Sequence, residues 1–167
     1  GKKHILEVWP NLELFMHGGV SFRPYRAQFE AIIPSPTMNY LESYNASEGS
    51  FAIQDRRGAD DMLLMLDYGI FYEFMPMEEL GSLSPRTVLL HEVQAGEQYA
   101  IVISTNGGLW RYMPGDTVRL TSVKPHRIQV SGRTKSFINA FGEELMVENA
   151  DRGVVAACEA TGAVVNE

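Results

Sequence analysis

The chain has 167 residues and 45% of them are apolar, so it can bury a core of ordinary size, and its length predicts one domain. Twenty-one acidic against fourteen basic side chains give a net charge of −7, which offers no positive field to a nucleic-acid backbone. The longest uninterrupted apolar run, residues 62–66, is far shorter than the ~20 residues that span a membrane. We therefore expect a cytoplasmic protein with no nucleic-acid or membrane partner.

The first 50 residues predict a strand, a helix and a second strand. Apolar side chains alternate with others over residues 12–16, which predicts a strand that ends at residues 17–19. Ser21 opens a helix, and Pro34 prevents the helix from continuing. Residues 37–44 again have a strand pattern, so this part of the chain predicts a βαβ unit.

From residue 50 onward the helical period disappears and short β-type runs follow one another. Residues 99–104 are rich in β-branched and aromatic side chains, and Asn106-Gly107 supplies a tight turn into a return strand at 109–112. The other predicted strands cover residues 51–54, 62–66, 70–75, 87–93, 118–121 and 127–130. The sequence thus predicts a mixed α+β fold in which an antiparallel meander or partial barrel follows the βαβ unit.

The β pattern stops at Gly132-Arg133, where the character of the chain changes. Residues 137–144 predict one strand or turn, and residues 143–160 predict an amphipathic helix that carries Cys158 on its apolar side. One strand and one helix cannot bury their own apolar faces. We therefore place a domain boundary here, with residues 1–131 in one domain and residues 132–167 as a hinge and the incomplete beginning of a second domain. The lone cysteine and the four scattered histidines predict no disulfide and no histidine metal site.

Three short motifs carry residues suited to ligand binding. They are Tyr44-Asn45-Ala46-Ser47-Glu48 at a strand end, Tyr112-Met113-Pro114-Gly115-Asp116 after the hairpin, and Gly132-Arg133 at the boundary. Each motif alone also fits a plain structural role, such as a polar loop, a turn-capping aspartate or a glycine turn. The two carboxylates are 68 residues apart, and the arginine follows the second carboxylate by 17 residues.

In this order and spacing the motifs resemble those of the AMP-forming adenylating superfamily. That superfamily carries Tyr-Gly-x-Thr-Glu, then Tyr-x-Thr-Gly-Asp, then a Gly-Arg hinge. The chain is most similar to one branch, the auxin- and jasmonate-conjugating acyl-acid-amido synthetases (the auxin-responsive Gretchen-Hagen type) and their bacterial relatives. The similar stretches are 14–26, 42–54, 65–76, 99–117 and 127–145, and their wording is closest to the bacterial members.

The resemblance implies an enzyme that uses ATP and Mg²⁺ to adenylate a carboxylic acid and then joins the acyl group to an amino acid or amine. Glu48 would hold Mg²⁺ against the phosphates, and Ser47 would donate a hydrogen bond to a phosphate oxygen. Asp116 would accept hydrogen bonds from both ribose hydroxyls of ATP or AMP. Arg133 would add a charge-assisted donor in the same region.

The resemblance also implies where the adenine lies and how the domains move. Tyr44 would offer its ring as a flat face for the base, and Gly18 and Gly19 would let the base approach the backbone. Residues 1–131 would be the C-terminal part of a large nucleotide-binding domain. Gly132 would act as the hinge about which the small C-terminal domain swings between the two half-reactions.

The sequence departs from the superfamily pattern in ways that bear on activity. Asn45 replaces a glycine, and Met113-Pro114 replaces the usual residues before Gly-Asp. A glycine-rich phosphate loop that ends in lysine is absent from the sequence, as is the catalytic lysine expected late in the C-terminal domain. We therefore expect an excised portion of a larger enzyme that has no synthetase activity by itself.

Two other functions remain open from the sequence. The chain could be a non-catalytic β-rich ligand-binding or interaction module, in which Tyr44, Glu48 and Asp116 are ordinary loop residues. The helix over 143–160 could bind a partner through its apolar stripe. The first alternative differs from the enzyme in one spatial respect, because only the enzyme requires Glu48, Asp116 and the Gly18-Gly19 backbone to border one site. The acyl acid, the amine and the oligomeric state stay open.

Overall fold

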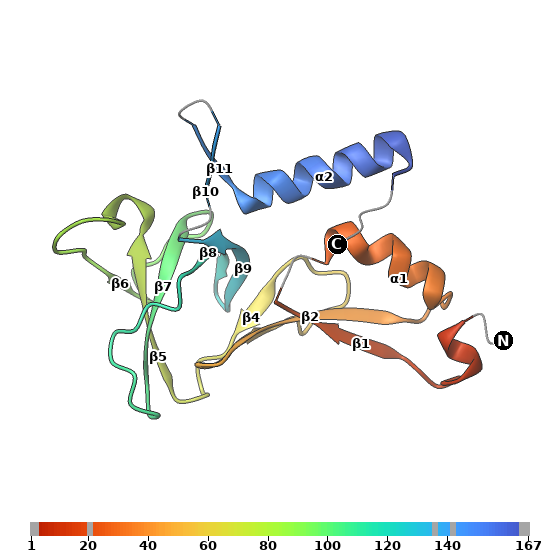
Figure 1. Cartoon of the computed structure of the whole chain (residues 1–167). Helices are drawn as coiled ribbons and strands as arrows, with labels where there is room; N and C mark the ends of the chain where they lie inside the picture. The colour runs from red at the N-terminus through yellow and green to blue at the C-terminus, as the bar shows by residue number, and fades with distance from the viewer. Residues whose placement is uncertain (1–3, 20–21, 135–136, 141–142, 164–167) are drawn as a thin grey trace.

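A computed structural model describes residues 4–19, 22–134, 137–140 and 143–163 of the chain (Figure 1). Nine strands form one mixed sheet in the order β1-β2-β3-β4-β9-β8-β7-β5-β6. The strands are β1 (Leu14–His17), β2 (Asn39–Ala46), β3 (Gly49–Ile53), β4 (Met62–Leu64), β5 (Ile70–Pro76), β6 (Val88–Leu89), β7 (Gln98–Thr105), β8 (Asp116–Val123) and β9 (His126–Arg133). This architecture confirms the predicted mixed α+β class.

The βαβ unit at the N-terminal end forms as predicted. Strands β1 and β2 pair in parallel, and the connection between them contains the short 3-10 helix η2 (Arg23–Tyr25) and the helix α1 (Arg26–Ile32). Aromatic rings from the connection pack on β1, with the ring centroids of Phe15 and Phe29 4.8 Å apart. The predicted helix start at Ser21 lies outside the described residues. A further 3-10 turn, η1 (Ile5–Glu7), precedes β1.

The remaining strands of the large sheet pair antiparallel, but their order is more complex than a meander. Strand β4 pairs with β9 from much later in the chain, and β5 pairs with β7. In Figure 1 the sheet bends, so that β5, β6 and β7 run across the direction of β1 and β2. The largest buried side chains, which fill the core of this bent sheet, are Phe51, Met62, Tyr72, Phe74, Ile101, Ile103, Leu120 and Ile128.

Two of the predicted strands are wrong in extent. The predicted return strand at 109–112 is reduced to one bridge between Ile103 and Tyr112, because Arg111 takes a positive φ of 47° and redirects the chain. The predicted strand at 87–93 shrinks to β6, because the chain turns there. The amide of Glu92 donates to the carbonyl of Leu89, and the Glu92 carboxylate accepts from the Leu89 amide at 2.7 Å.

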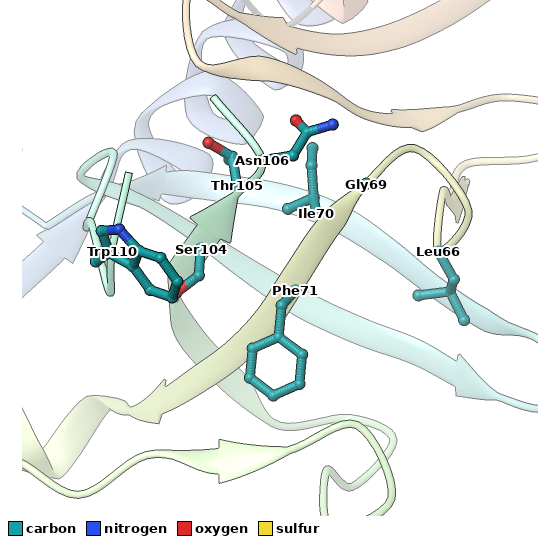
Figure 2. A pocket seen from close by; sticks show the side chains of 8 residues that line it. All are labelled: Leu66, Gly69, Ile70, Phe71, Ser104, Thr105, Asn106 and Trp110. Atoms are coloured by element: carbon teal, nitrogen blue, oxygen red, sulfur yellow. The ribbon is translucent and has the colours of Figure 1, made fainter. Parts of the chain in front are cut away.

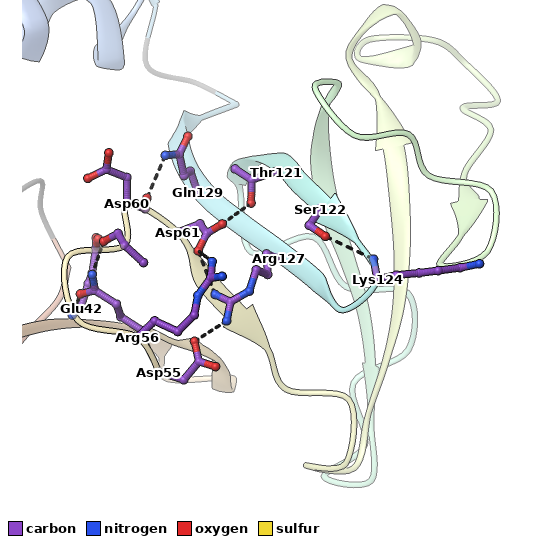
Figure 3. Close-up of polar contacts among 12 residues, drawn as sticks. Glu42, Asp55, Arg56, Asp60, Asp61, Thr121, Ser122, Lys124, Arg127 and Gln129 are labelled. Atoms are coloured by element: carbon purple, nitrogen blue, oxygen red, sulfur yellow. Dashed lines mark hydrogen bonds and ion pairs between the residues drawn. The ribbon is translucent and has the colours of Figure 1, made fainter.

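A buried ion-pair network ties the loop between β3 and β4 to β9 (Figure 3). The side chain of Arg127 is only 5% exposed and donates to both Asp55 and Asp61. Asp61 also accepts from Thr121 Oγ1 at 2.9 Å and from Arg56 Nη2 at 2.9 Å. Burial works to raise the pKa of Asp61, but the hydrogen bonds from Thr121, Arg56 and Arg127 outweigh burial, so the pKa lies below its ordinary value.

The end of the chain forms a hairpin and a helix. Strands β10 (Phe137–Ala140) and β11 (Glu143–Met146) pair antiparallel, where the sequence predicted one strand or turn. The predicted helix start at residue 143 is therefore wrong, and α2 (Val147–Thr161) begins after β11. Helix α2 contacts η2 and β9, and Cys158 on it is half-buried. The predicted domain boundary at residue 132 stays a prediction. In the described part of the chain, no helix has the length and apolar character to cross a membrane.

Candidate functional site

The carboxylate of Asp116 is held by residues from two other strands. Asp116 is the first residue of β8 and lies opposite Arg133, the last residue of β9, in the antiparallel register. Arg133 Nε lies 3.2 Å from Asp116 Oδ1, and the Tyr44 hydroxyl donates to Asp116 Oδ2 at 2.7 Å. Three strands separate β2 from β8 in the sheet order, so the bend of the sheet is what lets Tyr44 reach Asp116.

Tyr44 is buried, and this changes its predicted role. The residue is 7% exposed, and its ring packs against Phe51 with centroids 4.8 Å apart. The ring therefore has no free face for an adenine, contrary to what the resemblance implied. Burial raises the pKa of Tyr44 strongly, and the charge of Asp116 and the hydrogen bond to it raise it further. The phenol stays protonated and fixes the position of the Asp116 carboxylate.

Glu48 joins this group through Tyr112. Ser47 and Glu48 are the two turn residues of the β2–β3 hairpin, since Ala46 pairs with Gly49. The Tyr112 hydroxyl lies near the Glu48 carboxylate, whose influence, first as a hydrogen-bond acceptor and then as a charge, raises the pKa of Tyr112. The backbone of Tyr112 is fixed in turn, because its amide and carbonyl pair with Ile103 at 2.8 Å each. Tyr112 belongs to the second of the three sequence motifs, but the resemblance implied no role for it.

The two glycines after β1 differ in their surroundings. A Cβ on Gly18 would lie 2.3 Å from the carbonyl oxygen of Ser43, so Gly18 is required by close packing against β2. Gly19 has a φ of 88°, and a Cβ there would meet nothing within 4 Å. Gly18 therefore lies beside the residue that precedes Tyr44, and Gly19 lies in open space next to it. Ser47 is exposed in the turn with Glu48.

An open hollow of about 440 Å³ lies at the start of β5 and the end of β7 (Figure 2). Ile70 lines it, and the Cδ1 atom of Ile70 lies 2.9 Å from where a Cβ on Gly49 would stand. Phe71 and Trp110 form its apolar side, with Asn106 at the other end. Neither Asp116 nor Glu48 is among the lining residues, so none of the predicted site residues borders this hollow.

Of the sequence-predicted site residues, Tyr44, Asp116 and Arg133 meet directly. Ser47 and Glu48 lie in the β2–β3 turn, with Tyr112 near Glu48, whereas Gly18 packs on the Ser43 backbone and Gly19 faces open space. Among the described residues, no three histidine, cysteine or acidic side chains gather as a ready-made metal site. A single carboxylate such as Glu48 nevertheless fits Mg²⁺, which is usually held by one or two carboxylates with phosphates and waters.

The sequence and fold match a known family. The GH3 family central domain matches residues 63–133. Indole-3-acetic acid-amido synthetase GH3.8 of Oryza sativa subsp. indica is 30% identical over 128 residues, which cover 70% of this chain and 20% of that protein. This relative is a plant protein, so the predicted closeness to bacterial members stays a prediction.

Two solved structures share the fold. GH3.15 acyl acid amido synthetase superposes with a TM-score of 0.74 at 19% identity, over 92% of this chain and 28% of that one. ATP-bound MatB from Rhodopseudomonas palustris superposes with a TM-score of 0.54 at 12% identity, over 84% of this chain and 29% of that one. The chain thus spans about a fifth of the curated relative's length. Residues 63–133 thus match the central domain of the GH3 family, and the chain is similar to acyl-acid-amido synthetases of that family over part of their length.

Proposed function

We propose that this chain forms the ribose- and magnesium-binding part of an ATP-dependent acyl-acid-amido synthetase. The whole enzyme would adenylate a small carboxylic acid and then join the acyl group to an amino acid or amine. The observation that carries the proposal is the contact of Tyr44 and Arg133 with Asp116, beside the contact of Tyr112 with Glu48. The amido synthetase relative and the fold shared with ATP-bound MatB support it.

Asp116 is suited to bind the ribose of ATP or AMP. Its side chain is 17% exposed, and each of its oxygens already accepts one contact, from Tyr44 and from Arg133. An ionised carboxylate has about four acceptor positions, so two remain for the two ribose hydroxyls. Tyr44 would then act as a positioning residue, and Arg133 would interact with the nucleotide from the pivot beside Gly132.

Glu48 and Ser47 are suited to the phosphate end of the nucleotide. When bound, Mg²⁺ would neutralise phosphate charge, and Glu48 would hold it with the Tyr112 hydroxyl orienting the carboxylate. Ser47 stands next to Glu48 with an exposed hydroxyl that can donate to a phosphate oxygen. The open backbone at Gly19 would lie against the adenine, with Gly18 fixing the end of β1.

The reaction asks mainly for positioning and charge neutralisation from these residues. The oxygen of the acid forms a bond to the α-phosphorus of ATP, and pyrophosphate leaves. The amine then attacks the acyl carbon of the acyl-adenylate, an amide bond forms, a proton is released, and AMP leaves. Asp116 would hold the same ribose through both steps. We also propose that the enzyme works in the cytoplasm and that this polypeptide alone does not complete the reaction.

A nucleotide titration tests the site directly. AMP is added to the ¹⁵N-labelled 167-residue chain, and amide shifts are followed by NMR. We expect weak binding, with a Kd of about 1 mM because few contacts are available, and shifts near residues 44–48, 112–116 and 131–133. Replacing Asp116→Asn should weaken binding at least about tenfold, because one ribose contact to a charged group is lost.

Asp67→Asn serves as the matched control, because Asp67 is exposed and lies outside the contacts described above. It should leave the AMP shifts unchanged. The proposal fails if AMP shifts no residue of the site. It also fails if the Asp116→Asn chain binds AMP as well as the unaltered chain does.

A further inference from the structure

Arg111 has an unusual backbone conformation just before the site. Its φ is 47°, and among the described residues it is the one non-glycine residue with a positive φ. A side chain at this angle crowds its own backbone, and such a conformation persists only where the surroundings impose it. The next residue is Tyr112, which contacts Glu48, and Asp116 follows four residues later. The conformation of Arg111 thus sets the path of the loop that carries both.

A closed triangle of polar contacts holds the Arg111 side chain. Arg111 Nε donates to Glu73 Oε2 at 3.0 Å, and Arg111 Nη2 donates to Thr87 Oγ1 at 3.1 Å. The Thr87 hydroxyl completes the triangle by donating to Glu73 Oε1 at 2.6 Å. Glu73 lies in β5, and Thr87 directly precedes the short edge strand β6, which pairs with β5.

Glu73 is much more buried than Arg111, its ion-pair partner. The Arg111 side chain is 61% exposed, whereas that of Glu73 is only 12% exposed. Burial works to raise the pKa of Glu73, but the hydrogen bonds from Thr87 and Arg111 together outweigh it, and the pKa is lowered. The carboxylate is therefore ionised near neutral pH and holds the guanidinium. The backbone amide of Arg111 is fixed separately, by Ser104 Oγ at 3.0 Å.

We infer that Glu73, Thr87 and Arg111 form a positioning clamp for the nucleotide site. The clamp holds Arg111 in the left-handed backbone conformation. This conformation lets Tyr112 pair with Ile103 through both its amide and its carbonyl while its side chain reaches Glu48. None of the three residues would contact the nucleotide. The inference rests on the proposed function, because it assigns the clamp to that same site.

Amide hydrogen exchange on the 167-residue chain tests the clamp without any ligand. Thr87→Val removes the hydroxyl that takes part in two of the three contacts and keeps the shape of the side chain. We expect the amides of Tyr112 and Ile103 to exchange about tenfold faster, because local opening of the loop becomes easier. Thr87→Ser, which keeps the hydroxyl, should restore slow exchange. The Met65 amide, which donates to the Phe51 carbonyl at 2.8 Å, should not change.

Glu30→Gln is the control. Glu30 accepts from Arg26 Nε at 2.9 Å in an arginine–glutamate pair within α1, which includes no clamp residue. This change should leave the hydrogen-exchange rate of the Tyr112 amide unchanged. Arg111→Ala provides a second variant, since alanine lacks the guanidinium but keeps the cost of the positive φ, and it too should speed exchange.

The outcomes separate the clamp from the proposed function. Unchanged exchange at Tyr112 and Ile103 in both Thr87→Val and Arg111→Ala would overturn the clamp, even if AMP still binds the unaltered chain. Faster exchange in both variants supports the clamp. If AMP shifts no amide resonance of the unaltered chain, the proposed nucleotide site is refuted. The clamp would then stabilise the loop without serving a nucleotide site. Where AMP does bind, Thr87→Val should also weaken it severalfold, as expected of a positioning residue.

Discussion

Replacing Tyr44→Phe removes the hydroxyl that holds Asp116 and little else. The ring is 7% exposed and keeps its contact with Phe51, so no cavity forms in the core. One hydrogen bond to a charged group contributes about 1.5–3 kcal/mol. Because the Asp116 side chain is 17% exposed, water can partly replace the lost donor, and we expect the lower end, about 1.5 kcal/mol. For a chain of this size the loss should lower Tm by about 3–6 °C.

A double-mutant cycle isolates this hydrogen bond. The free energy of unfolding is measured by urea denaturation for Tyr44→Phe, Asp116→Ala and the double variant. In the Asp116→Ala background the Tyr44 hydroxyl has lost its acceptor, so Tyr44→Phe should cost nothing or even stabilise the chain. We expect a coupling energy of at least about 1.5 kcal/mol. A coupling within about 0.5 kcal/mol of zero would refute the reasoning. Tyr72→Phe is the control, since its hydroxyl donates to the neutral carbonyl of Met65 at 3.1 Å and should show no coupling to Asp116.

Three further predictions follow from described contacts. Gly18→Ala should lower the free energy of unfolding by about 3 kcal/mol, because the new Cβ would overlap a carbonyl of β2. Gly19→Ala should lower it by only about 1–2 kcal/mol, because its positive φ is the only obstacle. Thermal unfolding of the two variants makes the comparison. Because the pKa of Asp61 is lowered in the folded chain, its ion pairs contribute fully above its ordinary pKa of about 3.9 and are lost as the pH falls from there through the lower pKa of the folded state. Asp61→Asn should therefore make the free energy of unfolding less sensitive to acid, as urea denaturation at several pH values would show. Arg127→Met should lower the free energy of unfolding by about 3–5 kcal/mol, because Asp55 and Asp61 lose their shared buried partner. A decrease below about 1 kcal/mol in urea denaturation would contradict this account.

Local sequence patterns predicted most of the strands but not their neighbours. The alternation of apolar and polar residues located β8 and β9, and helical spacing located α2. Such patterns record which faces are buried, but not which strand lies alongside, so the pairing of β4 with β9 could not be read from them. The positive φ at Arg111 was also not indicated by the sequence, because glycine or asparagine is the usual residue at such a position.

The candidate site was predictable where spacing and strand geometry agree. Asp116 and Arg133 are 17 residues apart, and two eight-residue strands joined by a two-residue turn place them opposite each other. The role of Tyr44 was not predictable in this way. Its strand has mixed side chains on both faces, so the sequence did not indicate which face the bend of the sheet would bury. The contact of Tyr112 with Glu48 depends on the path of a whole loop, which spacing alone does not define.

The pairing of β4 with β9 has a consequence for biosynthesis. Asp61 and its partner Arg127 are separated by 66 residues along the chain. A ribosome that adds ~5–20 residues per second needs about 3–13 s to produce that separation. During this delay β3 and β4 have emerged with an apolar edge that no later strand has yet covered. Nascent chains that stall before β9 should therefore be good clients for chaperones, and truncation just before His126 should yield aggregates where the full chain stays in solution.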